Sequence, residues 1–188
     1  METLILASAS PRRQELLTRI GLPFEVIPTE ADEQTDLPAG KAVVELSRRK
    51  AEAARASHPH RWILAADTLV SLDGAGLGKP HSPGEAMDML RRLSGRTHQV
   101  FTGVTLIRPD GKMFTAEDES HVTFSPLSEE EIEAYVATGE PMDKAGAYAI
   151  QGMAGRWIRH MEGSPSGVIG LPLYTVDALL KEAGYYHG

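Results

Sequence analysis

Two consecutive arginines stand where the first turn of a helix is expected. Residues 3–7 form a short apolar run that predicts a buried strand, and Ser10 with Pro11 is typical of an N-cap followed by proline. Arg12 and Arg13 come next. The first turn of a helix already carries about half a positive charge, so two guanidinium groups there favour a bound anion. The alternative is that both side chains are solvated or paired with carboxylates elsewhere.

A carboxylate inside an apolar strand is the second feature. Residues 62–72 are the strongest apolar stretch and predict a central strand, which Asp67 and Thr68 interrupt. Burying a carboxylate costs several kcal/mol unless the group is paired, metal-bound or open to a cleft. Asp67 is therefore either a catalytic group at a cleft or a residue that caps a neighbouring loop.

Four further residues have weaker individual signals. Glu33 follows the expected second strand, and Lys50 lies in an expected helix, where a lysine is usually solvated. Lys79 stands in a Gly-Lys-Pro turn whose fixed backbone would aim its side chain reproducibly. Gln151 belongs to a run of small residues and could read a base edge through its amide, although that run could equally be a tight connection.

Composition and missing motifs exclude several classes of protein. The chain has 188 residues, a formal charge of −7 and no cysteine, which excludes disulfides, thiolate zinc sites and a cysteine nucleophile. The sequence contains no P-loop, no Gly-x-Gly-x-x-Gly and no His-Glu-x-x-His motif. We expect its seven scattered histidines to be surface residues or hydrogen-bonded core residues rather than functional groups. The acidic balance argues against nucleic-acid binding, and no stretch is apolar enough to span a membrane.

The expected elements form an α/β protein with a mixed sheet, because helices alternate with strands but two consecutive strands form a hairpin. We treat residues 1–188 as a single cytoplasmic domain whose apolar beginning is a strand rather than a signal peptide. Expected strands cover 3–7, 24–27, 62–72, 99–108, 112–124 and 157–161. Expected helices cover 11–20, 39–57, 83–93, 129–139 and 172–183, two of them preceded by capping boxes at 82–85 and 128–131. Residues 163–172 could be a substrate-facing loop or a turn.

Over nearly its whole length the sequence resembles the Maf family of nucleoside triphosphate pyrophosphatases. The shared motifs are Leu-Ala-Ser-Ala-Ser-Pro-Arg-Arg at 6–13, Ala-Asp-Thr at 66–68, Gly-Lys-Pro at 78–80, Thr-Gly-Val at 102–104, Asp-Lys-Ala-Gly-Ala-Tyr at 143–148, Ile-Gln-Gly at 150–152 and Gly-Leu-Pro at 170–172. The resemblance implies a mixed α/β fold like that of inosine triphosphate pyrophosphatases, with two lobes around a central cleft. It is also compatible with a homodimer.

The same resemblance implies roles for individual residues. The subgroup that acts on dTTP and UTP carries arginine, threonine and glutamine at three specificity positions, which here are Arg12, Thr68 and Gln151. The proton acceptor corresponds to Asp67. The positions lining the same pocket correspond to Ser8, Arg13, Glu33, Lys50 and Lys79. The late loop departs from the family pattern, with Pro165 and Gly167 in place of tyrosine and asparagine, so no contacts are carried over there.

The expected reaction is hydrolysis of dTTP, UTP and 5-modified relatives to the monophosphate and pyrophosphate. A triphosphate brings about four negative charges and should arrive with Mg²⁺ or Mn²⁺ held by Asp67 and Glu33. Asp67 would take the proton of the attacking water, while Arg12, Arg13, Lys50 and Lys79 offset charge on the departing pyrophosphate. Two alternatives remain: a broader pyrophosphatase for noncanonical triphosphates, and a nucleotide-binding regulator of cell division or septum formation.

Overall fold

One mixed seven-stranded sheet organises the chain, in a computed structural model that describes residues 1–187. The strand order is β2-β1-β3-β5-β6-β7, and β4 also pairs with β3. The strands are β1 (Leu4–Leu6), β2 (Phe24–Val26), β3 (Trp62–Leu72), β4 (Ala75–Leu77), β5 (Thr97–Ile107), β6 (Met113–Phe124) and β7 (Ile158–Glu162). The helices are α1 (Pro11–Arg19), α2 (Ala39–Ser57), α3 (Pro83–Leu93), α4 (Glu129–Ala137), α5 (Pro165–Ile169) and α6 (Leu173–Glu182). Short 3-10 turns are η1 (Glu140–Asp143), η2 (Ala145–Ala147), η3 (Met153–Trp157) and η4 (Tyr185–His187).

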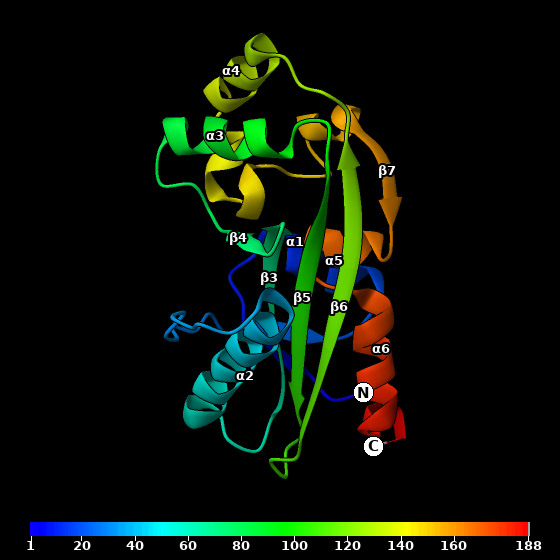
Figure 1. Cartoon of the computed structure of the whole chain (residues 1–188). Coiled ribbons are helices and arrows are strands. Elements are labelled where there is room, and N and C mark those ends of the chain that lie inside the picture. The colour runs from blue at the N-terminus through cyan, green and yellow to red at the C-terminus, as the bar shows by residue number, and fades with distance from the viewer. Residues whose placement is uncertain (188) are drawn as a thin grey trace.

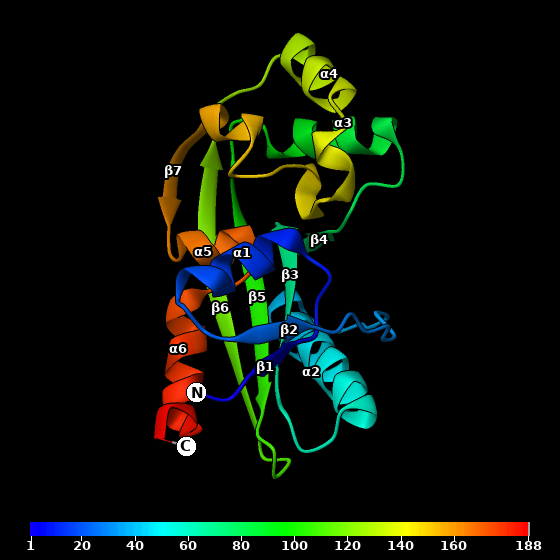
Figure 2. The same cartoon turned by 180° about the vertical axis from the view of Figure 1, so that it is seen from behind.

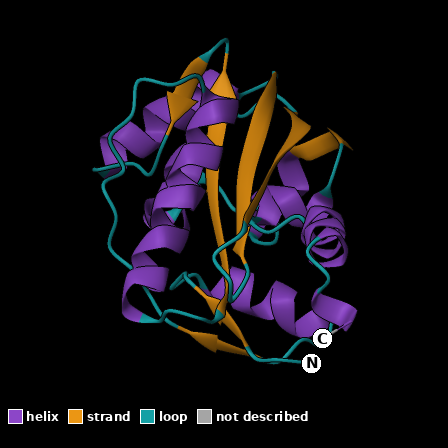
Figure 3. Ribbon diagram, turned by 90° about the horizontal axis from the view of Figure 1, so that it is seen from below, coloured by secondary structure: helices purple, strands orange, loops and turns teal. Residues whose placement is uncertain are grey.

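The expected mixed α/β class is confirmed, with β3 at the centre. β1 runs parallel to both β2 and β3, whereas β3, β5, β6 and β7 are successively antiparallel. Helices cover both faces of the sheet (Figures 1, 2 and 3). Helix α2 lies on one face, and α1 and α5 lie on the other, as the two opposite views show.

Successive side chains of a strand point to opposite faces of the sheet, so the strands contribute to a separate hydrophobic cluster on each face. Leu64 and Ala66 of β3 pack with α1 and α6, whereas Ile63 and Ala65 pack with α2. Gly103 of β5 has a specific role beneath α2, because a Cβ at this position would overlap the backbone of Val43. The absent side chain thus lets α2 lie close against the sheet.

A separate hydrophobic cluster forms the other end of the molecule. There the ends of β3, β5 and β6 pack with α3 and α4, which lie together at the top of Figure 1. Fully buried side chains of this cluster include Leu90, Phe124 and Tyr135. The presence of two lobes that surround a cleft stays a prediction.

Local sequence signals predicted most helix starts correctly, but the short strand β4 and the short helix α5 were not expected. Ser128 and Glu131 form the complete capping box expected before α4. Before α3, Ser82 caps Glu85 as expected, but the Glu85 carboxylate accepts from the backbone of His81, so that box is only half formed. β4 was not expected, and it follows a turn in which Asp73 and Gly74 both have positive φ.

Residues 163–172 contain a short helix rather than only a loop or a turn. Ser164 is the N-cap of α5, its hydroxyl accepting from the backbone N–H of Gly167, and Pro165 occupies the first helical turn. Proline fits there because the first N–H groups of a helix have no intrahelical partner. The departure from the family pattern at Pro165 therefore suits the local backbone.

Candidate active site

The candidate site lies at a gap in one edge of the central strand. β1 pairs with residues 62–64 of β3, and β4 pairs with residues 70–72 on the same edge, while β5 covers the other edge along 63–71. Residues 65–69 therefore have no strand neighbour on the β1 side. A cavity of about 500 Å³ opens there and is lined by Asp67 and Thr68. Their side chains belong to opposite faces of the sheet, and both reach the cavity because the edge between them is open.

On the α2 face, Asp67 is held by a lysine. Its Oδ1 lies 2.6 Å from the Nζ of Lys50 in α2, and the Oε1 of Glu33 lies 3.4 Å from the same Nζ. The side chains of Lys50 and Asp67 are 16% and 13% exposed, whereas that of Glu33 is 68% exposed. Asp67 is paired with Gly103 across the sheet, so the close approach of α2 brings Lys50 within reach. The carboxylate in an apolar strand is thus both paired and open to a cavity.

On the opposite face, Arg13 is held by neutral oxygens. Its Nε donates to Gly170 O at 2.7 Å, its Nη1 to Ser8 Oγ at 3.2 Å and its Nη2 to Thr68 Oγ1 at 3.2 Å. Burial, followed by the nearby charge of Arg12, lowers the pKa of Arg13 below its usual value, and the negative charge of Asp67 opposes that shift. Ser8 is buried behind Arg13 and does not line the cavity, so it can act on a ligand only through that guanidinium.

Two further cations face the cavity without an acidic partner. Within residues 1–187, neither Arg12 nor Lys79 forms a salt bridge, and both line the cavity. The cationic side chains of the lining outnumber its carboxylates by five to three in a chain whose net charge is −7. These charged groups are Arg12, Arg13, Lys50, Lys79 and Lys144 against Glu33, Asp67 and Asp143. The cavity is therefore a local positive region suited to a polyanion.

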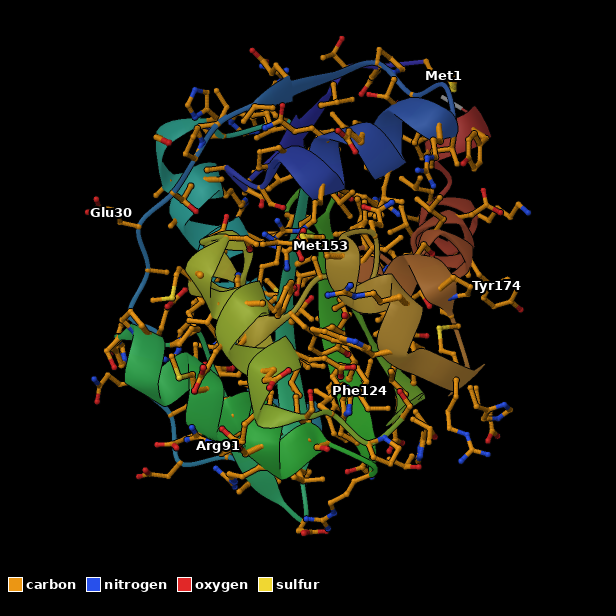
Figure 4. All side chains as sticks on the ribbon, turned by 90° about the horizontal axis from the view of Figure 1, so that it is seen from above. Met1, Glu30, Arg91, Phe124, Met153 and Tyr174 are labelled. Atoms are coloured by element: carbon orange, nitrogen blue, oxygen red, sulfur yellow. The ribbon has the colours of Figure 1, made fainter. Side chains whose placement is uncertain are left out.

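The segment that carries Gln151 is fastened at both ends. Ala149 N donates to the hydroxyl of buried Tyr135 at 3.3 Å, and Met153 N donates to Oε1 of Glu140 at 3.3 Å. Gln151 itself is exposed and lines the cavity. In the view from above, Met153 lies near the middle of the molecule (Figure 4). Tyr135 and Glu140 were not singled out from the sequence, because nothing in the pattern of the helix or of the turn indicates that they contact this segment.

The segment of residues 163–172 contacts the site through its backbone. Val168, Ile169 and Gly170 line the cavity, and the carbonyl oxygens of Gly167 and Gly170 accept from Thr102 and Arg13. None of these hydrogen bonds uses the side chain at a position where the sequence departs from the family pattern. The departures at 165 and 167 therefore leave these contacts intact.

His81 is exposed, as expected, but also lines the cavity, whereas His98 lies in the core with one ring nitrogen unsatisfied. His81 lines the cavity on the segment between β4 and α3, so it faces the candidate site. His98 is buried, with Nε2 2.6 Å from the hydroxyl of Tyr148, while its Nδ1 has no hydrogen-bond partner. Burial lowers the pKa of His98 from 6.5 to about 4, so this side chain is neutral at pH 7.

One solved structure of similar fold is the Ham1 protein of Staphylococcus aureus. It has a TM-score of 0.56 and 16% sequence identity, with 97% of this chain and 100% of that chain covered. At this identity the likeness concerns the fold alone, and it confirms the mixed α/β fold class that the resemblance to the Maf family implied.

The family follows from sequence. The model of the Maf family, described as Maf-like protein, matches residues 3–183. A protein of Symbiobacterium thermophilum named dTTP/UTP pyrophosphatase is 51% identical, with 98% of this chain and 96% of the relative covered. A protein of Syntrophus aciditrophicus with the same name is 50% identical, with 97% and 91% covered. The chain belongs to the Maf family.

Proposed function

We propose that this protein hydrolyses dTTP and UTP to the corresponding monophosphate and pyrophosphate. The two relatives described above are named for this activity and match nearly the whole chain. The observation that carries the proposal is that the Asp67–Lys50 pair shares one cavity with two unpaired cations, Arg12 and Lys79. A carboxylate next to a polyphosphate site fits a catalytic role, because without a metal ion its negative charge would only oppose binding of a polyanion.

Asp67 is the general base in this proposal. A water attacks the α-phosphorus, the bond from that phosphorus to the bridging oxygen of the β-phosphate breaks, and Asp67 accepts the proton of the water. Lys50 donates to Oδ1 of Asp67 at 2.6 Å, which fixes the carboxylate of this cavity-lining residue and leaves its second oxygen to accept the proton. The fixed orientation removes the entropy cost of positioning the base during the reaction.

Arg12, Lys79 and Arg13 bind the phosphates and offset the negative charge that grows on the leaving pyrophosphate. Arg12 and Lys79 have no carboxylate partner among residues 1–187, so binding them to phosphate breaks no ion pair. Hydrogen bonds from guanidinium groups to phosphate are short and about twice as strong as those between neutral groups. Arg13 adds charge from a fixed position beside Ser8 and Gly170.

The carboxylates fit a divalent cation that arrives with the substrate. Asp67 and Glu33 both lie beside the Lys50 ammonium, so they already share one positive charge, and carboxylate oxygens are the ligands that Mg²⁺ and Mn²⁺ prefer. Among residues 1–187, no group of three or more acidic or histidine side chains could hold a metal, so phosphate oxygens and water must complete any coordination. A bound cation would supply charge neutralisation at the phosphates.

Gln151 and Thr68 are the proposed specificity residues, together with Arg12. The exposed amide of Gln151 has a donor and an acceptor, which matches the alternating edge of a uracil or thymine ring. The segment that carries it is fixed by Tyr135 and Glu140, so the amide is presented from a constant position.

No helix in the described residues 1–187 is long and apolar enough to cross a membrane. A cytoplasmic location and a homodimer belong to this proposal because nucleoside triphosphates are cytoplasmic metabolites and the sequence resemblance is compatible with pairing.

The deciding experiment is pyrophosphate release from each common and 5-modified triphosphate, with Mg²⁺, with Mn²⁺ and with chelator. The proposal expects release from dTTP and UTP, with loss of activity in chelator. Equal release from noncanonical purine triphosphates would support the broader pyrophosphatase instead. Binding of dTTP without any release of pyrophosphate would support a regulator and overturn the proposed activity.

A further inference from the structure

A chain of hydrogen bonds crosses the sheet from Arg13 into the protein interior. Nη2 of Arg13 donates to Thr68 Oγ1 at 3.2 Å, and Thr68 Oγ1 lies 3.0 Å from Thr102 Oγ1. Thr102 Oγ1 in turn donates to the carbonyl oxygen of Gly167 at 3.0 Å. The chain therefore joins α1, β3, β5 and α5.

The direction of each bond follows from the hydrogens available. A carbonyl oxygen can only accept, so the single hydroxyl hydrogen of Thr102 goes to Gly167. Thr102 must then accept from Thr68, which commits the only hydroxyl hydrogen of Thr68. Thr68 consequently offers Arg13 a lone pair and has no hydrogen left to donate to a nucleobase.

The guanidinium of Arg13 is thereby held without being neutralised. Its hydrogen-bond acceptors are the oxygens of Ser8, Thr68 and Gly170, none of which carries a charge. A guanidinium has five N–H hydrogens, and these bonds use one from each of its three nitrogens. The remaining hydrogens and the full positive charge stay available to a ligand in the cavity that Arg13 lines.

Along β5, Thr102 is flanked by apolar residues on its own face of the sheet. On the same face of β5, its neighbours Val100 and Val104 are buried and apolar, and both are two residues away. Thr102 is only 1% exposed, and a valine there would have nearly the same shape but would leave the carbonyl oxygen of Gly167 without this donor. The hydroxyl at 102 therefore serves its hydrogen bonds to Thr68 and Gly167 rather than the packing of β5.

We propose that Thr102 is a positioning residue of the anion site. By donating to Gly167 it forces the Thr68 lone pair towards Arg13, and this aims the free guanidinium hydrogens at a phosphate group. The inference rests on the proposed function only in that the bound anion is the substrate's polyphosphate. It assigns the specificity position Thr68 an indirect role, exerted through Arg13 rather than through contact with the base.

The test compares Thr102→Val with Thr105→Val on the same strand. Thr105 is also fully buried, but its hydroxyl lies 2.7 Å from Ser47 Oγ, on the α2 face and outside the chain just described. The probe is inorganic tripolyphosphate, measured by titration calorimetry, together with kcat and KM for dTTP. We expect Thr102→Val to weaken tripolyphosphate binding and raise KM, each about 10-fold, with a much smaller change in kcat. Thr105→Val should leave both binding and KM unchanged, whatever its melting temperature.

Two further variants keep the proposal falsifiable. Thr102→Ser retains the hydroxyl and should restore tripolyphosphate binding to near the parent value. Thr68→Val breaks the same chain at a partly buried position, so it should weaken binding about 10-fold even if Thr102→Val does not fold. In a double-mutant cycle, the Thr68→Val and Thr102→Val effects should not add, because either change alone interrupts the chain.

Unchanged tripolyphosphate binding in Thr102→Val or Thr68→Val would overturn the inference, and so would additive effects or a serine variant as weak as the valine variant. The proposed function fails separately, if the parent protein releases no pyrophosphate from dTTP or UTP. Tripolyphosphate binding still decides the role of Thr102 in that case.

Discussion

The two faces of the central strand bring charge to the cavity in opposite ways. On the α2 face, Lys50 and Asp67 form an ion pair at 2.6 Å, so each charge is compensated within the protein. On the α1 face, Arg13 is held by three neutral oxygens and keeps its charge for a ligand. In the proposed reaction the first face therefore orients the base, whereas the second attracts the anion.

The strongest way to break this comparison is to neutralise the base on the α2 face. Asp67→Asn keeps the shape of the side chain and removes its ability to accept a proton. We expect kcat for dTTP to fall by at least about 10²-fold, the usual scale for a positioned base, with tripolyphosphate binding retained. Near-normal turnover would show that Asp67 is not the proton acceptor. Circular dichroism of the variant provides the control for folding.

Removing the partner of the base tests whether the ion pair orients it. Lys50→Met keeps an unbranched apolar side chain at this position of α2 and leaves Asp67 without its donor. We expect kcat to fall roughly 30-fold and KM to change less, because orientation of the base is lost before phosphate binding. Lys41→Met is the matched control, because Lys41 is exposed on the first turn of the same helix. A larger effect on KM than on kcat would assign Lys50 to phosphate binding instead.

The buried, uncharged His98 at the far end of the α1 face allows the comparison to be tested by changing the pH. His98 has a pKa of about 4 in the folded state, against 6.5 for an exposed histidine. As pH falls below 6.5, the unfolded chain binds a proton that the folded chain does not. The contribution of neutral His98 to the free energy of unfolding is therefore fully present above pH 6.5 and is lost as pH falls towards 4. The expected loss is on the order of 2 kcal/mol at pH 5. Urea unfolding at pH 7.5 and 5 measures it, and a His98→Phe variant should show a shallower pH dependence.

The smallest expected effect concerns an unpaired cation at the start of α1. Arg12→Ala should raise KM for dTTP and weaken tripolyphosphate binding, each about 10-fold, with kcat affected less. Arg19→Ala changes an exposed arginine at the other end of the same helix and should alter neither quantity. If both variants behave alike, the effect arises from overall charge rather than from a contact in the cavity.

Local patterns in the sequence were sufficient for most of the fold. The apolar run at 62–72, the Ser10-Pro11 helix start and the capping box at 128–131 all correspond to observed elements, because each depends on residues close in sequence. β4 was missed although Asp73 and Gly74 supply the dipeptide that favours a tight hairpin turn. The helix at 165–169 was missed because its five residues contain too few apolar positions to show a period.

The site could be assembled only in part from sequence. The charge pattern at the start of α1 pointed to Arg12 and Arg13, and the carboxylate within an apolar strand pointed to Asp67, whereas the resemblance supplied the roles of the weaker candidates. Sequence could not show that Gly170 helps to hold Arg13, because the two residues are 157 positions apart along the chain. The open edge of β3 was equally invisible, since it arises where β1 has ended and β4 has not begun.

The hydrogen bond from Arg13 to Gly170 also links ligand binding in the cavity to the stability of the folded chain. It connects α1 with the segment just before the last long helix, so unfolding must separate two regions that a shared ligand would hold together. A ligand present at 100 times its dissociation constant adds about 2.7 kcal/mol to the free energy of unfolding. We therefore expect a triphosphate bound in the cavity to raise the resistance of this protein to proteolysis.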